Sequence, residues 1–194
     1  GSPAELLQGG CAVLSSNAAL AKAVEECLQL SPKGDCSKGS HGAIGEWDVS
    51  RITDMDSIFV DAHSFNGDIS KWDMSSVVTM IAMFYQARSF NGDISKWDIS
   101  RVIDMDSLFA EAAWFNGDIS KWDVSSVTNR AGMFCHTPSC SGDISPWNVS
   151  NKRRHLVVGR IQHLAVISRR GTYPTCGTCP AYSGDVSRWN VSSV

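Results

Sequence analysis

Hydrophobic residues recur along this chain with a period of 25 residues. Tryptophan stands at five equally spaced positions: Trp47, Trp72, Trp97, Trp122 and Trp147. Phenylalanine follows twelve residues after each of the first four, at Phe59, Phe84, Phe109 and Phe134. A repeat of this length predicts a stack of similar units, because one such unit cannot bury its own apolar face.

The second half of each unit has the spacing of a short amphipathic helix. In one unit the apolar residues at i, i+3, i+4 and i+7 are Met80, Met83, Phe84 and Ala87. Each expected helix is preceded by a residue whose side chain can cap it: Asp54, Thr79, Asp104 and Asn129. The first three are followed by an Asn-Gly pair, Asn66-Gly67, Asn91-Gly92 or Asn116-Gly117, which predicts a tight turn with positive φ.

The first half of each unit is expected to be extended. There the apolar residues Ile69, Trp72, Met74 and Val77 are spaced by two or three positions. The pattern therefore predicts an α/β repeat solenoid, a stack of short strands and short helices.

The chain divides into four parts on this pattern. A helix with Leu20, Val24 and Leu28 on one face is expected to cap the first repeat, within a lead-in at 1–40. Regular repeats fill 41–150, and an insertion with a cysteine-containing irregular unit fills 151–183. A final repeat begins at 184–194, with its tryptophan at Trp189.

The insertion is basic and contains no Asp or Glu. Its cationic residues are Lys152, Arg153, Arg154, Arg160, Arg169 and Arg170. They are candidates for contact with an acidic partner, and the alternative is a solvated loop with no binding role.

Aspartate forms two rows across the repeats. One row is Asp68, Asp93, Asp118 and Asp143, and the other is Asp48, Asp73, Asp98 and Asp123. Stacked carboxylates could bind calcium. The serine two residues after each of them favours turns in which the carboxylate accepts backbone N–H groups.

Seven cysteines indicate an oxidising compartment. Cys135, Cys140, Cys176 and Cys179 fall at nearby positions of adjacent repeats. They are expected to form one or two disulfides, with a zinc site as the alternative. Cys27 and Cys36 are a further candidate disulfide, for which Cys11 is a competing partner.

Composition and charge exclude several classes of function. A net charge of −3 gives no reason to expect a nucleic acid partner, and no apolar run is long enough to cross a bilayer. The five histidines have no triad or ligand spacing, and no Gly-rich phosphate loop is present. We therefore expect no enzymatic activity and no cofactor.

The repeated string from Trp-Asp-Val-Ser-Ser-Val-Thr through Met-Phe to Phe-Asn-Gly-Asp-Ile-Ser resembles the BspA-like surface-protein repeat. It covers about 45–140 and 184–194, and the lead-in with Cys27, Pro32, Gly34 and Cys36 resembles that of algal and protist members. The resemblance implies a leucine-rich-repeat-like fold, usually exported, that binds other proteins and transfers no catalytic residue.

Together these observations predict a non-catalytic protein-binding or scaffold module, at the cell surface or in an organelle lumen such as that of the thylakoid. One alternative is an accessory structural subunit of a large membrane assembly, for example on the lumenal side of an algal photosystem. The other is a metal-binding or carbohydrate-binding surface protein.

Overall fold

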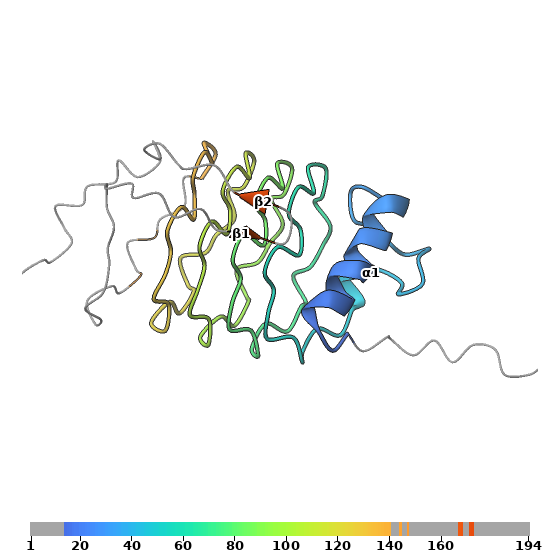
Figure 1. Cartoon of the computed structure of the whole chain (residues 1–194), viewed down its shortest axis with the longest axis horizontal. Helices are drawn as coiled ribbons and strands as arrows, with labels where there is room; N and C mark the ends of the chain where they lie inside the picture. The colour runs from blue at the N-terminus through green and yellow to red at the C-terminus, as the bar shows by residue number, and fades with distance from the viewer. Residues whose placement is uncertain (1–13, 141–143, 145–146, 148–166, 169–170, 173–194) are drawn as a thin grey trace, which may run out of the picture.

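The computed structural model describes residues 14–140, 144, 147, 167–168 and 171–172. Successive 25-residue units stack side by side (Figure 1). We call each unit a coil and end it at its tryptophan: coil 1 is 48–72, coil 2 is 73–97, coil 3 is 98–122 and coil 4 is 123–147. The regular elements in the described residues are the helix α1 (Asn17–Leu30), the 3₁₀ helix η1 (Ile44–Glu46), and strands β1 (Ile167–Ser168) and β2 (Gly171–Thr172). The two strands pair antiparallel.

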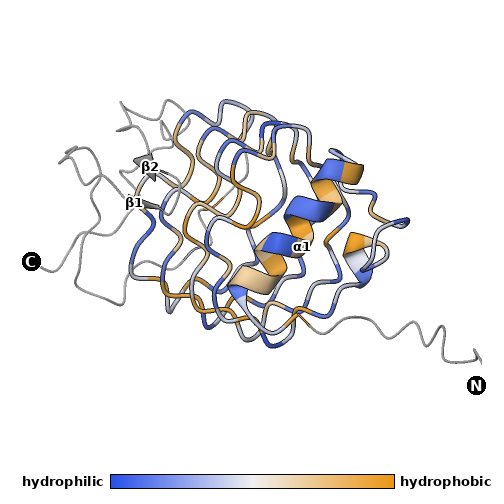
Figure 2. Cartoon of the chain, turned by 45° about the vertical axis from the view of Figure 1, so that its right-hand side comes forward, coloured by the Kyte–Doolittle hydropathy of each residue, from blue (hydrophilic) through white to orange (hydrophobic). Residues whose placement is uncertain are grey.

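Helix α1 is the N-terminal helix that the apolar spacing predicted, and it lies across the first coil (Figures 1 and 2). Ser16 is its N-cap, and the Ser16 hydroxyl accepts from the N–H of Ala19 at 3.2 Å. The helix ends just before Ser31-Pro32, because the residue preceding a proline is disfavoured in the helical conformation. Its buried residues, Leu20, Ala23, Val24 and Cys27, join the main core.

Asn17 completes the hydrogen bonding of coil 1. Its side-chain amide donates to the carbonyl oxygens of Asp54 and Asp56, both at 3.1 Å. In coil 2 the equivalent carbonyls, those of Thr79 and Ile81, accept from backbone N–H groups of coil 1. Asn17 thus replaces the backbone of a preceding coil, which coil 1 does not have.

We expect Asn17→Ala to lower the free energy of unfolding by about 1–2 kcal/mol, because two net hydrogen bonds are lost. Urea denaturation followed by tryptophan fluorescence measures the change. Lys22→Ala, on the exposed side of the same helix, is the matched control and should change stability by less than about 0.5 kcal/mol. Equal effects of the two substitutions would show that Asn17 has no capping role.

Neighbouring coils are joined along the segments 55–65, 80–90, 105–115 and 130–140, which we call the turn segments. Every second N–H donates to the carbonyl 24 residues later, in the next coil. In coil 2 the donors Met80, Ala82, Phe84 and Gln86 bond to Asp104, Asp106, Leu108 and Ala110 at 2.8–3.0 Å. The intervening N–H groups close tight turns onto carbonyls three residues back, as Tyr85 does onto Ala82.

The predicted α/β solenoid of short strands and short helices was wrong. In the turn segments, left-handed backbone recurs every four residues, as at Ala82 and Gln86 with φ of 53° and 55°. An α-helix would need right-handed backbone and bonds to carbonyls four residues back. Consecutive tight turns also place a residue on the core side every three or four positions, so they produce the spacing that suggested a helix.

The predicted strands are also absent from the described coils. Tight turns close at Ile69–Trp72 and at Met74–Val77, which prevents an extended strand. Isolated parallel bridges join Asp54, Thr79, Asp104 and Asn129, the residues expected to be N-caps. The coils therefore do not alternate strand and helix, as the resemblance to leucine-rich repeats implied.

The Asn-Gly pairs do not supply positive φ. The backbone of Gly67, Gly92 and Gly117 does not have positive φ. Glycine is needed at these positions because a side chain would collide with a neighbouring ring. A Cβ on Gly92 would lie 3.0 Å from the ring of Phe90 in the same coil. The glycine thus makes room for the aromatic core, and the Asn91 side chain accepts from the N–H of Asn116 in the next coil at 2.8 Å.

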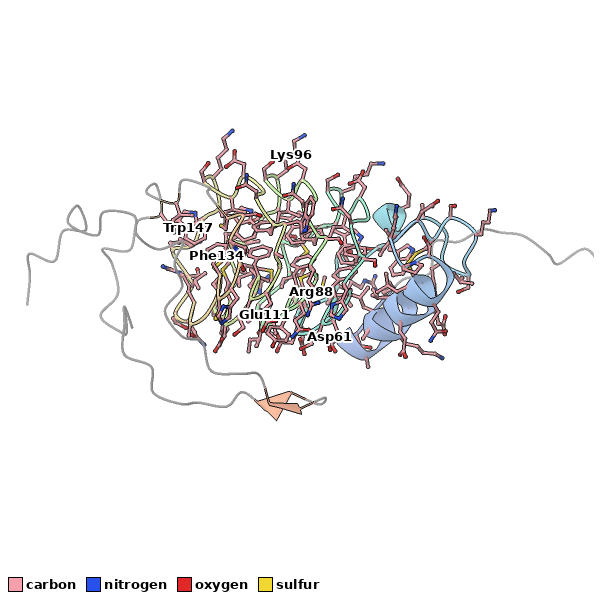
Figure 3. All side chains as sticks on the ribbon, turned by 90° about the horizontal axis from the view of Figure 1, so that it is seen from above. Asp61, Arg88, Lys96, Glu111, Phe134 and Trp147 are labelled. Atoms are coloured by element: carbon pink, nitrogen blue, oxygen red, sulfur yellow. A yellow bond between two sulfur atoms is a disulfide. The ribbon has the colours of Figure 1, made fainter. Side chains whose placement is uncertain are left out.

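The core is a set of aromatic ladders that run through the stack. Phe59, Phe84, Phe109 and Phe134 stack with ring centroids 5.4, 5.6 and 5.8 Å apart. Indoles also join successive parts of the stack: the ring N–H groups of Trp72, Trp97, Trp122 and Trp147 each donate to the carbonyl of an isoleucine 28 residues earlier, whereas that of Trp47 donates to Gly42. Trp97 bonds in this way to Ile69 at 3.2 Å, and Trp147 to Ile119 at 3.0 Å (Figure 3 labels Trp147).

Candidate binding surface

The turn segments carry their variable residues on the side away from the main core, and we call this side the turn face. The inward residues of the segments are nearly the same in each coil, whereas the outward ones differ. Figure 3 shows Asp61, Arg88 and Glu111 on this side and Lys96 on the opposite side. The turn face is thus where this chain departs from its own repeat.

Carboxylates on the turn face are set two coils apart. Asp56 is half-buried, and it accepts from the Thr79 hydroxyl at 2.6 Å and from the N–H of Ile81 at 2.8 Å. Asp106 takes the same place in coil 3 and accepts from the Ser107 hydroxyl at 2.7 Å. The coil between them has Ile81 at this position, which keeps like charges from adjacent coils apart.

Burial raises the pKa of Asp56 and of Asp106 above the usual range for aspartate. Hydrogen bonds from Thr79 and Ser107 oppose this effect only in part. For a carboxyl group whose pKa is higher in the fold, ionisation favours the unfolded chain. Each group therefore destabilises the fold at neutral pH, and the penalty disappears as the pH falls below the unfolded pKa.

We expect Asp106→Asn to make the protein more stable than the wild type at pH 7, with the difference vanishing near pH 3, where the wild-type carboxyl is protonated in both states. Thermal unfolding across this pH range measures the effect. Asp93→Asn is the control of opposite sign, because hydrogen bonds from Ser95 lower the pKa of Asp93. A stability difference for Asp106→Asn that did not depend on pH would contradict the role of ionisation.

One large apolar side chain stands out at the margin of the turn face. Trp114 is 72% exposed. The equivalent residue in the other coils is serine, at Ser64, Ser89 and Ser139. The N–H of Trp114 donates to the carbonyl of Arg88 at 3.1 Å, so the backbone of Trp114 is fixed to the neighbouring coil while its indole faces solvent.

On the other side of the stack, the predicted aspartate turns are confirmed. The carboxylates of Asp48, Asp68, Asp73, Asp93, Asp98, Asp118 and Asp123 each accept from the N–H of the serine two residues later. These bonds account for the recurring Asp-x-Ser pattern without a metal. In the described part of the chain, no group of three or more His, Cys, Asp or Glu residues is arranged to hold a metal ion. Asp143 lies outside the described residues.

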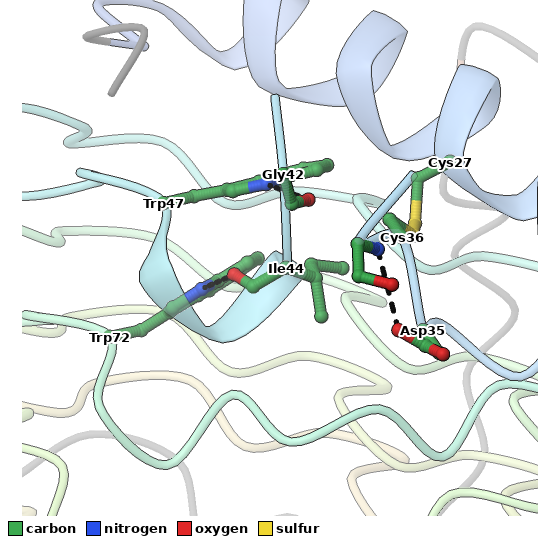
Figure 4. Close-up of a disulfide and its surroundings, with 8 residues drawn as sticks. Cys27, Asp35, Cys36, Gly42, Ile44, Trp47 and Trp72 are labelled. Atoms are coloured by element: carbon green, nitrogen blue, oxygen red, sulfur yellow. Dashed lines mark hydrogen bonds between the residues drawn. A yellow bond between two sulfur atoms is a disulfide. The ribbon is translucent and has the colours of Figure 1, made fainter. Parts of the chain in front are cut away.

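The cysteine predictions have mixed outcomes. Cys27 and Cys36 form a disulfide that ties α1 to the following loop (Figure 4). Cys135 is also disulfide-bonded, and Cys140 is half-buried against the main core. Cys11, Cys176 and Cys179 lie outside the described residues, so the choice between disulfides and zinc for the second cluster stays a prediction.

A hollow of about 240 Å³ lies beside the first disulfide, between α1 and the loop that follows it. Its lining includes Glu26, Lys38, His41 and Trp47. The Nδ1 atom of His41 is buried there without a hydrogen-bond partner, and its ring packs edge-on against Trp47. This ring packing gives His41 a structural role beside the cap.

The predicted basic residues, Lys152, Arg153, Arg154, Arg160, Arg169 and Arg170, all lie outside the described residues. Sequence reasoning missed the capping role of Asn17 and the exposure of Trp114. Trp114 could have been found by aligning the repeats, because it is the one departure from serine in its row. Asn17 had no such signal, since its partners are main-chain carbonyls of a distant segment.

Residues 34–147, more than half of the chain, match the family described as "Mycoplasma protein of unknown function, DUF285". The chain belongs to this family. The match begins just after α1 and ends at the last tryptophan of the regular repeat, so the DUF285 region coincides with the stacked coils. Comparisons with curated proteins and with solved structures give no match. Among the described residues, no helix has both the length and the apolar character needed to span a bilayer.

Proposed function

We propose that this DUF285 protein is a non-catalytic protein-binding module of an exported or organelle-lumenal protein. The observation that carries the proposal is Trp114, which replaces serine in its row and is 72% exposed. Tryptophan and arginine are enriched at protein interfaces. Exposed Arg88 accepts the N–H of Trp114 through its main-chain carbonyl, so an arginine and this tryptophan lie on adjacent coils.

Three further features support the proposal. The aromatic ladders make the stack a rigid support, on which outward residues can vary without loss of the core. The Cys27–Cys36 disulfide fits an oxidising compartment outside the cytosol. The repeat string is similar to that of the BspA-like surface proteins, which work in adhesion and protein binding.

Trp114→Ser is a sharp test, because serine occupies the same place in three other coils and should leave the fold intact. We expect this substitution to abolish most partner capture by the immobilised protein from extracts of its native cells. An anchor tryptophan contributes about 2 kcal/mol or more, which corresponds to roughly thirtyfold in affinity.

The control is Lys96→Gln, on the opposite side of the stack (Figure 3), which should capture the same partners as the wild type. Melting temperatures of both variants check that the fold is retained. Equal capture by wild type and Trp114→Ser would show that this edge is not the binding surface. A captured glycan in place of a protein would favour the carbohydrate alternative.

A further inference from the structure

Two rows of the turn segments adopt left-handed backbone, and their side chains differ in kind. The first row consists of the small residues Ser57, Ala82, Ser107 and Gly132. The second, which we call the polar row, consists of Asp61, Gln86, Glu111 and His136. Positive φ favours glycine and tolerates small residues better than long ones. The polar row therefore keeps larger side chains where the backbone gives no reason for them, which points to a role on the surface.

The turn face carries an excess of negative charge. The carboxylates of the turn segments belong to Asp56, Asp61, Asp106 and Glu111. Arg88 is exposed, whereas the half-buried Arg130 donates from its guanidinium to the carbonyls of Val124 and Val127. None of the four carboxylates forms an ion pair with another described residue. Within the described coils, their charge is thus left for a partner to balance.

The opposite side of the stack does not share this excess. Lysine recurs there at Lys71, Lys96 and Lys121, three residues after an aspartate in each coil (Figure 3 labels Lys96). Cations and carboxylates are therefore interspersed on that side. The uncompensated negative charge is a property of the turn face, the same face that has the exposed tryptophan at its margin.

Trp114 and the charged face meet in coil 3. Glu111 precedes Trp114 by three residues, and the Tyr85 hydroxyl donates to the Glu111 carboxylate at 3.1 Å, which holds this carboxylate in place. Lysine and arginine combine an aliphatic stem, which packs on an aromatic ring, with a cationic head group that pairs with a carboxylate. An exposed indole close in the chain to a fixed carboxylate suits such side chains.

We propose that the partner segment bound by the turn face is rich in lysine and arginine. Its cationic groups pair with Asp61 and Glu111, and an aliphatic stem packs on Trp114. Arg88 lies in coil 2, between the two acidic coils, so it repels cations there and directs them to coils 1 and 3. This inference rests on the proposed function and adds the chemistry of the partner.

Selection from a displayed library of random 12-residue peptides on the immobilised full chain tests the preference. We expect lysine and arginine to outnumber aspartate and glutamate by about twofold or more in the enriched peptides. Enriched peptides without this excess, or no enrichment over a blank surface, would overturn the inference. Sedimentation of the protein alone tests the other occupant, a second copy of this chain. A dimer that the charge variant described next abolishes would also overturn it.

Fluorescence polarisation with the most enriched peptide then assigns the charges. The charge variant is Asp61→Asn/Glu111→Gln, which keeps an acceptor for the Tyr85 hydroxyl. Its matched control is Asp93→Asn/Asp118→Asn, which removes the same charge on the opposite side and keeps the acceptors for Ser95 and Ser120. We expect the charge variant to bind about tenfold more weakly than the wild type, and the control to bind equally well.

Thermal unfolding checks that both variants fold like the wild type. Raising the salt to about 0.5 M should weaken binding to the wild type, because screening acts on exposed ion pairs. Loss of binding in Trp114→Ser with no effect of the charge variant would overturn this inference and leave the proposed function standing. Weaker binding by the charge variant with no effect of Trp114→Ser would retain the basic preference and remove Trp114 as the anchor. No effect of either would overturn both.

Discussion

Phe84→Ala should lower the free energy of unfolding by about 3–5 kcal/mol, the largest effect of any single substitution considered for this protein. The Phe84 ring is fully buried in the middle of the stack. It stacks on Phe59 at 5.4 Å, Phe109 at 5.6 Å and Phe90 at 4.0 Å, and it also contacts Trp97. Removing it leaves a cavity that borders three coils and that the hydrogen-bonded backbone cannot close.

Urea denaturation followed by circular dichroism measures this loss. Trp114→Ser serves as the control, because it removes a larger aromatic ring from an exposed position and should change stability by less than about 0.5 kcal/mol. A loss below about 1 kcal/mol for Phe84→Ala would mean that the ladder is not the main source of stability.

Replacing both Cys27 and Cys36 by alanine should lower stability by roughly 2–3 kcal/mol in oxidising buffer. The two residues are 9 positions apart, and a bond that closes a loop of this size removes conformational entropy from the unfolded chain. The bond also fixes the loop against α1, whose other attachments are its apolar face and Asn17.

The same comparison in a reducing buffer separates the bond from packing. Wild type and variant then both lack the cross-link, and the difference between them should fall to the small contribution of the two buried sulfur atoms. A difference that is the same in both buffers would show that packing, and not the disulfide, holds α1 on the stack.

The turn face is where the proposed binding function is placed. Its outward rows vary while the inward residues repeat, so a new contact can arise there without disturbing the ladders. Trp114 is a departure of this kind, because serine takes its place in the other coils.

Some parts of the fold could be read directly from the residues. The 25-residue spacing of tryptophan predicted the stacking, and the Asp-x-Ser strings predicted turns closed by aspartate side chains. Leu20, Val24 and Leu28 predicted α1. These predictions succeeded because each depends on a local hydrogen bond or on a period that only stacking can satisfy.

The local structure of the coils could not be read in the same way. The spacing of Met80, Met83, Phe84 and Ala87 fits both an α-helix and consecutive tight turns. The choice depends on where the N–H groups bond, and their acceptors are carbonyls 24 residues away in the next coil. The sequence pattern likewise predicted that Gly92 is needed for a turn with positive φ. The structure shows that glycine is needed there because a Cβ would lie too close to the Phe90 ring.

The sequence by itself therefore determined the repeat, the buried aromatic positions and the N-terminal helix, because burial of apolar residues at a fixed period leaves little freedom. Only the tertiary structure decided that the coils contain turns in place of helices and strands. It alone revealed Asn17 as the cap, since that role depends on carbonyls 37 and 39 residues away. The physical reason is the same in each case: hydrogen bonds between coils compete with local ones, and they exist only once the coils are stacked.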